Sequence, residues 1–230
     1  MRSTRLLKYC FAVFCGSALM LAPAQASTYD WATWTTQSGT TVNGSLTFGV
    51  QTVNLTYTGE VYFTQLNNAG TNYYLPTTTF ADGPTTTDMI SIFGSGVTHT
   101  VTFSSPVVNP VMAIVSLGQP ALGTIYNFDS PFTILSQGTE NVYGGCATCL
   151  SGDGTSSLKG TEGDGIIEFV GTFSSLSWTA SNGEYWNGFT FGAAGAGTPT
   201  SGVPEPGSLA LTALAIVGSL VLVLRRRLRA

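Results

Sequence analysis

Short segments in which apolar and polar residues alternate run through the middle of the chain. In one of them Val53, Leu55 and Tyr57 alternate with polar residues, and a glycine bounds the segment on each side. Alternation with a period of two places apolar side chains on one face of a β-strand. No part of residues 27–191 shows a convincing helical period, and helix-favouring Glu, Lys, Arg and Gln are scarce. About ten such segments predict an all-β domain, an antiparallel β-sandwich of jelly-roll type.

Glycine, proline and asparagine predict where these strands are interrupted. We expect a turn at Asn43-Gly44, a long loop from Asn67 to Pro84, and a bend over Ser105–Pro110, where two prolines cannot both occupy a central strand. Val111–Leu117 is the most continuous apolar run and is expected to be a central strand buried on both faces. Gly144–Gly165 is rich in glycine and acidic residues, and a loop is expected there.

The N-terminus has the three parts of a secretory signal peptide. Arg2, Arg5 and Lys8 precede an apolar run from Tyr9 to Leu21, and Ala24-Gln25-Ala26 follows. A basic start, a short apolar run and a small-residue cleavage site are typical of exported precursors. Residues 1–26 are therefore predicted to be removed, with cleavage after Ala26.

The C-terminus also has three parts in a fixed order. Val203-Pro204-Glu205-Pro206 is expected to be rigid and extended, because each proline restricts itself and the residue before it. Residues 207–224 are uncharged and apolar, and as a helix they would span roughly 27 Å, enough to cross a thin bilayer core. A basic cluster that should stay in the cytoplasm ends the chain. It consists of Arg225, Arg226, Arg227 and Arg229.

This tail resembles the PEP-CTERM sorting signal of Gram-negative bacteria, over about the last 28 residues. The resemblance implies recognition by exosortase, a membrane-embedded cysteine protease-transpeptidase, and processing at the Pro-Glu-Pro motif. It also implies a cell-surface or extracellular role associated with exopolysaccharide. The expected organisation is a signal peptide over 1–26, an exported domain over 27–191, a small-residue linker over 192–202, and a sorting signal over 203–230 with its helix at 207–224.

The exported body is strongly acidic. Of the eight Lys and Arg residues, three lie before residue 27 and four after residue 224, so Lys159 alone remains. Eleven of the twelve acidic residues lie in the body, which gives it a net charge of about −10. Nucleic-acid binding depends on Lys and Arg contacts with phosphate, so we exclude it as a function.

Cys146 and Cys149 are the cysteines that remain after signal-peptide removal, since Cys10 and Cys15 lie within it. Their C-x-x-C spacing suits a disulfide, a redox pair or half of a zinc site. A redox pair favours a helix N-terminus, whereas glycines flank these two cysteines. A zinc site needs further Cys or His ligands, and the body has one histidine. We favour a disulfide that pins a loop.

The same segment holds Asp153, Glu162 and Asp164 among glycines. Carboxylate oxygens and tight turns are what a structural Ca²⁺ site uses, although EF-hand spacing is absent. A solvated acidic loop is the favoured alternative, and we expect no other cofactor.

Catalysis is not expected. His99 alternates with apolar residues and is predicted to face solvent, and the body has neither a second histidine nor a G-x-S-x-G motif. A glycosidase would need two paired carboxyl groups, and nothing in the sequence pairs any two. The candidates are Glu60, Asp82, Asp88, Glu140, Glu168 and Glu184.

Tyr185 and Trp186 lie beside Asn182, Glu184 and Asn187 in an expected turn. Aromatic faces next to amide and carboxylate groups suit the stacking and hydrogen bonding of sugar rings, although packing within the domain is the favoured role. The leading hypothesis is therefore an exported surface or matrix protein. The alternatives are a carbohydrate-binding module for the same polysaccharide and a glycosidase.

Overall fold

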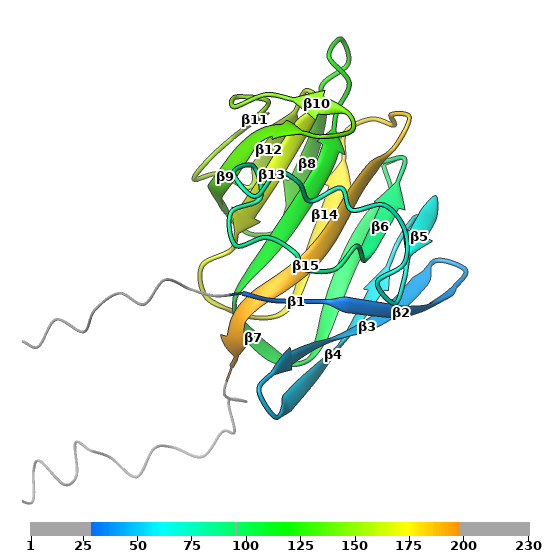
Figure 1. Ribbon diagram of the computed structural model, residues 1–230, viewed down its shortest axis with the longest axis vertical. Coiled ribbons are helices and arrows are strands. Elements are labelled where there is room, and N and C mark those ends of the chain that lie inside the picture. Colours follow the sequence, from blue (N-terminus) through cyan, green and yellow to red (C-terminus); the bar gives the residue numbers. More distant parts are fainter. Residues whose placement is uncertain (1–28, 95, 198–230) are drawn as a thin grey trace, which may run out of the picture.

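A computed structural model describes residues 29–94 and 96–197 (Figure 1). Every regular element in these ranges is a β-strand, and every strand pairing is antiparallel. The predicted all-β antiparallel domain is thereby confirmed. The predicted signal peptide, sorting motif, C-terminal helix and arginine cluster lie outside the described residues. Within the described ranges, no helix has the length and apolar character needed to cross a membrane.

The strands have the following bounds: β1 Asp30–Trp31, β2 Thr33–Ser38, β3 Thr41–Phe48, β4 Gln51–Thr58, β5 Phe63–Gln65, β6 Met89–Ile92, β7 Thr98–Leu117, β8 Thr124–Phe128, β9 Thr133–Glu140, β10 Gly144–Gly145, β11 Leu150–Ser151, β12 Ser157–Gly160, β13 Gly163–Glu168, β14 Thr172–Ala180 and β15 Asn187–Ala196.

Strand β7, with 20 residues, connects two halves of the sheet. Its N-terminal part pairs with β4 and β14, in the order β2-β3-β4-β7-β14-β8-β12-β11. Its C-terminal part pairs with β13 on one side and β15 on the other. Strands β9 and β10 follow beyond β13, and strands β6 and β5 follow beyond β15. Between them, Asn109 has a positive φ of 45° and precedes Pro110. The bend predicted at Ser105–Pro110 is thus a corner within one continuous strand that passes from one half of the sheet to the other, rather than a break between two strands.

The main hydrophobic core lies between the two halves. Trp178 of β14 packs edge-on against Phe189 of β15 with ring centroids 5.1 Å apart, and Tyr57 of β4 contacts Phe189 at 5.4 Å. The indole of Trp34 donates to Thr190 Oγ1 at 3.0 Å. Full burial of each side chain of this size contributes roughly 2 to 3 kcal/mol to the free energy of unfolding. These contacts join side chains from both halves in one core.

A smaller core lies on the outer face of the second half. Val111 and Val115 of β7 pack there with Tyr74 and Phe80, whereas Met112 and Ile114 point into the main core. Val111–Leu117 is therefore a central strand buried on both faces, as predicted. The covering side chains come from the long segment between β5 and β6, which crosses this face in Figure 1. That segment is the predicted long loop.

Three sequence expectations about glycine are wrong. Asn43-Gly44 is not a turn but lies inside β3, where a Cβ at Gly44 would be 2.6 Å from Thr33 O. The turns that bound β3 are at Gly39 and Gly49, both with positive φ. The predicted loop at 144–165 contains three short strands and the start of β13. Finally, β15 continues to Ala196, into the expected linker.

Candidate functional site

A cleft of about 470 Å³ opens beside the C-terminal end of β7. It is lined by Pro120, Tyr143, Gly145, Cys149, Thr161 and Glu162. These residues come from the turn after β7, from the segment between β9 and β11, and from the turn that leads into β13. The cleft is therefore built from segments that the sheet pairing, rather than the sequence order, brings together.

The end of β7 organises three carboxyl groups around this cleft. Ser116 donates its backbone N–H to Asp164 Oδ1 at 2.7 Å and its hydroxyl to Glu162 Oε1 at 2.6 Å. The N–H of Gly118 donates to Glu184 Oε1 at 3.0 Å. Hydrogen bonds to carboxylates are stronger than those between neutral groups. One strand end thus fixes the positions of all three acids.

The backbone at this point is unusual. Ser116 and Glu162 have positive φ values of 57° and 62°. This left-handed region costs non-glycine residues on the order of 1 kcal/mol, and such residues cluster at functional sites. The register between β13 and β7 shifts at Gly163/Gly165, directly after Glu162, which accepts the Ser116 hydroxyl.

Asp164 is fully buried, and its Oδ2 has no hydrogen-bond partner among the described residues. Burial, above all, raises the pKa of this carboxyl group to about 8; the charges of Glu140 and Glu162 act in the same direction, and the hydrogen bond from Ser116 opposes them. Asp164 is thus mainly protonated at neutral pH. It is not part of a solvated loop, contrary to the favoured expectation.

Glu140 adds a fourth carboxyl group. It lies at the end of β9, two residues beyond Gly138, which is the partner of Asp164 in the sheet. Its Oε2 accepts the backbone N–H groups of Val142 and Tyr143 at 2.8 and 2.7 Å, which fixes the turn that carries Tyr143. Its buried Oε1 has no partner within the described part of the chain.

Glu184 lies in the connection between β14 and β15, and Asn187 Nδ2 donates to its Oε1 at 2.6 Å. Asn187 in turn accepts the hydroxyl of buried Tyr126. Burial raises the pKa of Glu184 to about 7, opposed by its hydrogen bonds to Gly118, Asn187 and Thr124, and the charge of Glu162 adds to the rise.

An aromatic surface borders the cleft. We define it as Tyr62, Phe63, Tyr73, Phe93, Tyr143 and Trp186. Trp186 is half-buried at its centre, with ring centroids 5.1 Å from Tyr143, 5.3 Å from Phe63 and 5.7 Å from Tyr73. Tyr62, Phe93 and Tyr143 are exposed. Tyr143 belongs both to this surface and to the cleft.

The other residue of the predicted aromatic pair, Tyr185, is 76% exposed next to Trp186. The structure thus brings Trp186 into a larger group of rings and leaves Tyr185 mostly in solvent. Alternation could not find the other members of this group, because they come from the β5 and β6 region, the long loop and the turn after β9.

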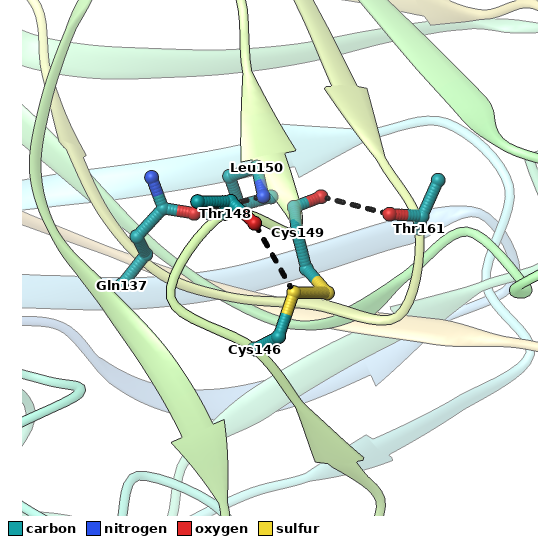
Figure 2. The surroundings of a disulfide bond; sticks show 6 residues. All are labelled: Gln137, Cys146, Thr148, Cys149, Leu150 and Thr161. Carbon is teal, nitrogen blue, oxygen red and sulfur yellow. Dashed lines mark hydrogen bonds between the residues drawn. A yellow bond between two sulfur atoms is a disulfide. The ribbon is translucent and has the colours of Figure 1, made fainter.

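Cys146 and Cys149 form a disulfide, as predicted, with a Cα–Cα distance of 5.1 Å. Figure 2 shows the bridge between β10 and β11, where Leu150 N donates to Gln137 Oε1 at 2.9 Å and Thr161 Oγ1 donates to Cys149 O at 3.4 Å. Cys149 lines the cleft. The disulfide therefore pins one wall of the site.

The three acids of the predicted Ca²⁺ site are not placed alike. Glu162 and Asp164 meet at Ser116, whereas Asp153 is exposed in the turn between β11 and β12, where it accepts Ile134 N at 2.7 Å. Within the described ranges, no group of three or more His, Cys, Asp or Glu residues has an arrangement that could hold a metal ion. The Ca²⁺ site stays a prediction.

The solvent-facing position predicted for His99 is wrong. His99 is fully buried, its Nδ1 lies 2.8 Å from the hydroxyl of Tyr57, and its ring stacks on Trp178 at 5.3 Å. Burial lowers its pKa to about 4, opposed by the charge of Glu60. A signal for this was present, since His99 has the same parity along the strand as the core residues Val101 and Phe103.

Of the six candidate glycosidase acids, the structure brings Glu140 and Glu184 to the surroundings of the cleft. The other four lie elsewhere: Glu60 accepts Gly94 N, Asp88 accepts Asn68 N, Glu168 accepts the hydroxyl of Tyr29, and Asp82 is exposed. Ser116 and Gly118, which organise the acids, carry no motif of their own and could not be identified from the sequence. Comparison with protein-family models, curated proteins and solved structures finds no match for this chain.

Proposed function

We propose that this protein is an exported β-sandwich of the cell surface or extracellular matrix, and that it holds polysaccharide on the aromatic surface. Its signal-peptide pattern supports export, and its Val203–Pro206 motif with the apolar segment and arginine cluster supports processing by an exosortase in a Gram-negative bacterium. The C-terminal helix would hold the precursor in the membrane until that processing occurs. The role is binding rather than catalysis.

The observation that carries the binding role is the group of rings around Trp186. Isolated exposed aromatic residues are common, but contiguous exposed apolar patches on a soluble domain mark interaction sites. Here Trp186 contacts three other rings, and two of the exposed members, Tyr62 and Phe93, have centroids 4.1 Å apart. Ring faces flanked by hydrogen-bonding groups such as Glu162 and Thr161 suit a sugar chain.

Binding to polysaccharide tests this proposal. The exported protein, purified from the medium or cell surface, would be incubated with a glycan array and with the host's own exopolysaccharide. We expect retention on glycan, and we expect Tyr143→Ala and Trp186→Ala to lower the affinity at least tenfold. Such losses correspond to about 1.4 kcal/mol or more, as expected for a ring that stacks on a ligand.

Val50→Ala is the matched control, because Val50 is a fully exposed apolar residue in the β3–β4 turn and outside the aromatic surface. It should bind like the wild-type protein. Equal retention of the wild-type protein and both ring variants would refute the proposal. The release of reducing ends during the same incubation would instead identify a glycosidase.

A further inference from the structure

We propose that Tyr73 and Tyr143 form a site of oxidative cross-linking, at which a peroxidase with hydrogen peroxide joins the two phenol rings covalently. This inference goes beyond glycan binding and does not depend on it. Two tyrosyl radicals combine readily when their rings are already in contact, and exported proteins meet oxidising conditions. Within residues 29–94 and 96–197, Tyr73 and Tyr143 are the one pair of tyrosine rings in contact.

The two rings are stacked. Their centroids are 5.9 Å apart, and their planes differ by 24°. Burial raises the pKa of the Tyr143 phenol, and the charge and hydrogen bonding of the Tyr73 phenol raise it further. Tyr73 can act on Tyr143 in this way only because their hydroxyl groups are close. The ring carbons next to each hydroxyl group carry much of the unpaired electron of a tyrosyl radical, so the atoms that would form the bond lie on the same side of the pair.

Neighbouring residues hold both tyrosines in place. Tyr74, directly after Tyr73, is buried and donates its hydroxyl to Asp88 O at 3.0 Å. On the other side, the backbone N–H of Tyr143 donates to Glu140 Oε2 at 2.7 Å. Reacting groups that a fold already holds together combine much faster than groups that must meet by diffusion. Coupling within one molecule is therefore favoured over coupling between molecules.

Trp186 packs against both tyrosines and leaves their faces to each other. Its ring meets Tyr143 edge-on at 5.1 Å between centroids and an angle of 84°, and it meets Tyr73 at 5.7 Å and 65°. Tyr143 is 42% exposed, so an oxidant can reach its phenol from solvent. Tyr185 is more exposed, at 76%, but it has no ring contact with another tyrosine in the described part of the chain.

The cross-link forms by the coupling of two tyrosyl radicals. Each phenol loses one electron and one proton, and together these reduce one molecule of hydrogen peroxide to two molecules of water. The radicals then form a carbon–carbon bond between the ring positions next to their hydroxyl groups. The hydrogen atom on each bonded carbon moves to the oxygen atom, which restores both phenols. The product has lost two hydrogen atoms, and it connects the long segment between β5 and β6 with the turn after β9.

Peptide mapping tests the inference. The purified exported protein would be treated with a haem peroxidase and an equimolar amount of hydrogen peroxide, then unfolded and cleaved after glutamate. This cleavage separates residues 61–140, which include Tyr73, from residues 141–162, which include Tyr143. We expect the two peptides to be recovered as one species that is lighter than their sum by two hydrogen atoms. Fragment ions should place the bond between the two tyrosines.

Phenylalanine variants identify the residues that react. Tyr73→Phe and Tyr143→Phe each keep a ring and remove one phenol, and each should abolish the joined peptide. Tyr185→Phe is the matched control, because Tyr185 is the more exposed tyrosine and lacks a tyrosine neighbour. It should yield as much joined peptide as the wild-type protein. Circular dichroism of the three variants would show that they fold.

The products distinguish ring contact from simple exposure as the cause of reaction. Absence of the joined peptide after peroxidase treatment, or its persistence in Tyr143→Phe, would overturn the inference. Covalent dimers linked through Tyr185 as the main product would also overturn it, because exposure would then select the site. None of these results bears on glycan binding, which the array measures separately.

Discussion

Replacing Asp164 with asparagine should remove an unusual pH dependence of stability. The carboxyl group has a pKa of about 8 in the folded protein, against 3.8 for an unperturbed aspartate. Between these values the folded state holds a proton that the unfolded state has lost, so unfolding becomes easier as pH rises. The stability associated with Asp164 is thus fully present below pH 4 and is lost as pH rises toward 8.

Other groups define the best window for the measurement. Glu184, with its pKa raised from 4.5 to about 7, has the same sign as Asp164. His99, with its pKa lowered from 6.5 to about 4, has the opposite sign: its contribution is present above pH 6.5 and is lost as pH falls toward 4. Above pH 6.5 the slope from His99 fades, and it is the same in the wild-type protein and in Asp164→Asn. Asp164 then dominates, with Glu184 adding to it mainly below pH 7.

The expected magnitude follows from the size of this window. One pKa unit corresponds to about 1.4 kcal/mol, so from pH 6.5 to 8 Asp164 should lower the free energy of unfolding by about 1.5 kcal/mol. For a domain of this size such a loss lowers Tm by roughly 3 to 6 °C. In Asp164→Asn the side-chain oxygen can still accept the Ser116 N–H, but no charge forms.

Urea unfolding at pH 6.5, 7.0, 7.5 and 8.0 would measure this slope for both proteins. We expect the wild-type protein to lose about 1.5 kcal/mol more than Asp164→Asn over the series. Asp30→Asn, which changes an exposed acid on β1, should keep the wild-type slope. Parallel curves for wild type and Asp164→Asn would refute the assignment of a buried, protonated carboxyl group at this position.

Three further predictions concern the disulfide, calcium and the tail. Replacing Cys146 and Cys149 with serine should lower stability by about 2 kcal/mol or less, because the closed loop is short, and urea unfolding without reductant would measure it. If the predicted Ca²⁺ site exists, millimolar Ca²⁺ should raise Tm and EDTA should lower it; an unchanged melting curve would leave no support for that site. The mature protein should lack residues 207–230, and replacing Pro204-Glu205-Pro206 with three alanines should keep it in the membrane at full length. Mass spectrometry of the C-terminal peptide from the native host decides this, and an intact arginine terminus in most mature protein would indicate an ordinary membrane anchor instead.

Local patterns were sufficient to predict much of the strand content. Alternation along Val53, Leu55 and Tyr57 depends only on the period of two within one strand, and all three side chains enter the core as expected. The apolar run at Val111–Leu117 was also a local signal, because continuous hydrophobicity within one strand indicates burial on both faces. The disulfide was predictable because it joins residues three positions apart.

Glycines showed where local reasoning fails. A glycine marks a turn when its φ is positive, as at Gly39, but it also marks a close approach by another segment. Gly44 and Gly192 are of the second kind, because a Cβ at either would lie within 3 Å of Trp34 or Trp31, respectively. Both tryptophans precede the glycine they contact by at least ten residues. The sequence around each glycine therefore could not distinguish a strand from a turn.

The candidate site was harder to predict, because its chemistry arises from pairing between distant strands. Asp164 and Ser116 are 48 residues apart, and they meet because β13 pairs with β7. The acidic segment was visible in the sequence, but burial of Asp164 depends on neighbours from β9 and β10 that cover it. Composition counts charges without placing them, so it predicted a solvated acidic loop. The fold instead places one acid in the cleft wall and one beneath it, and this difference in burial gives neighbouring carboxyl groups different roles.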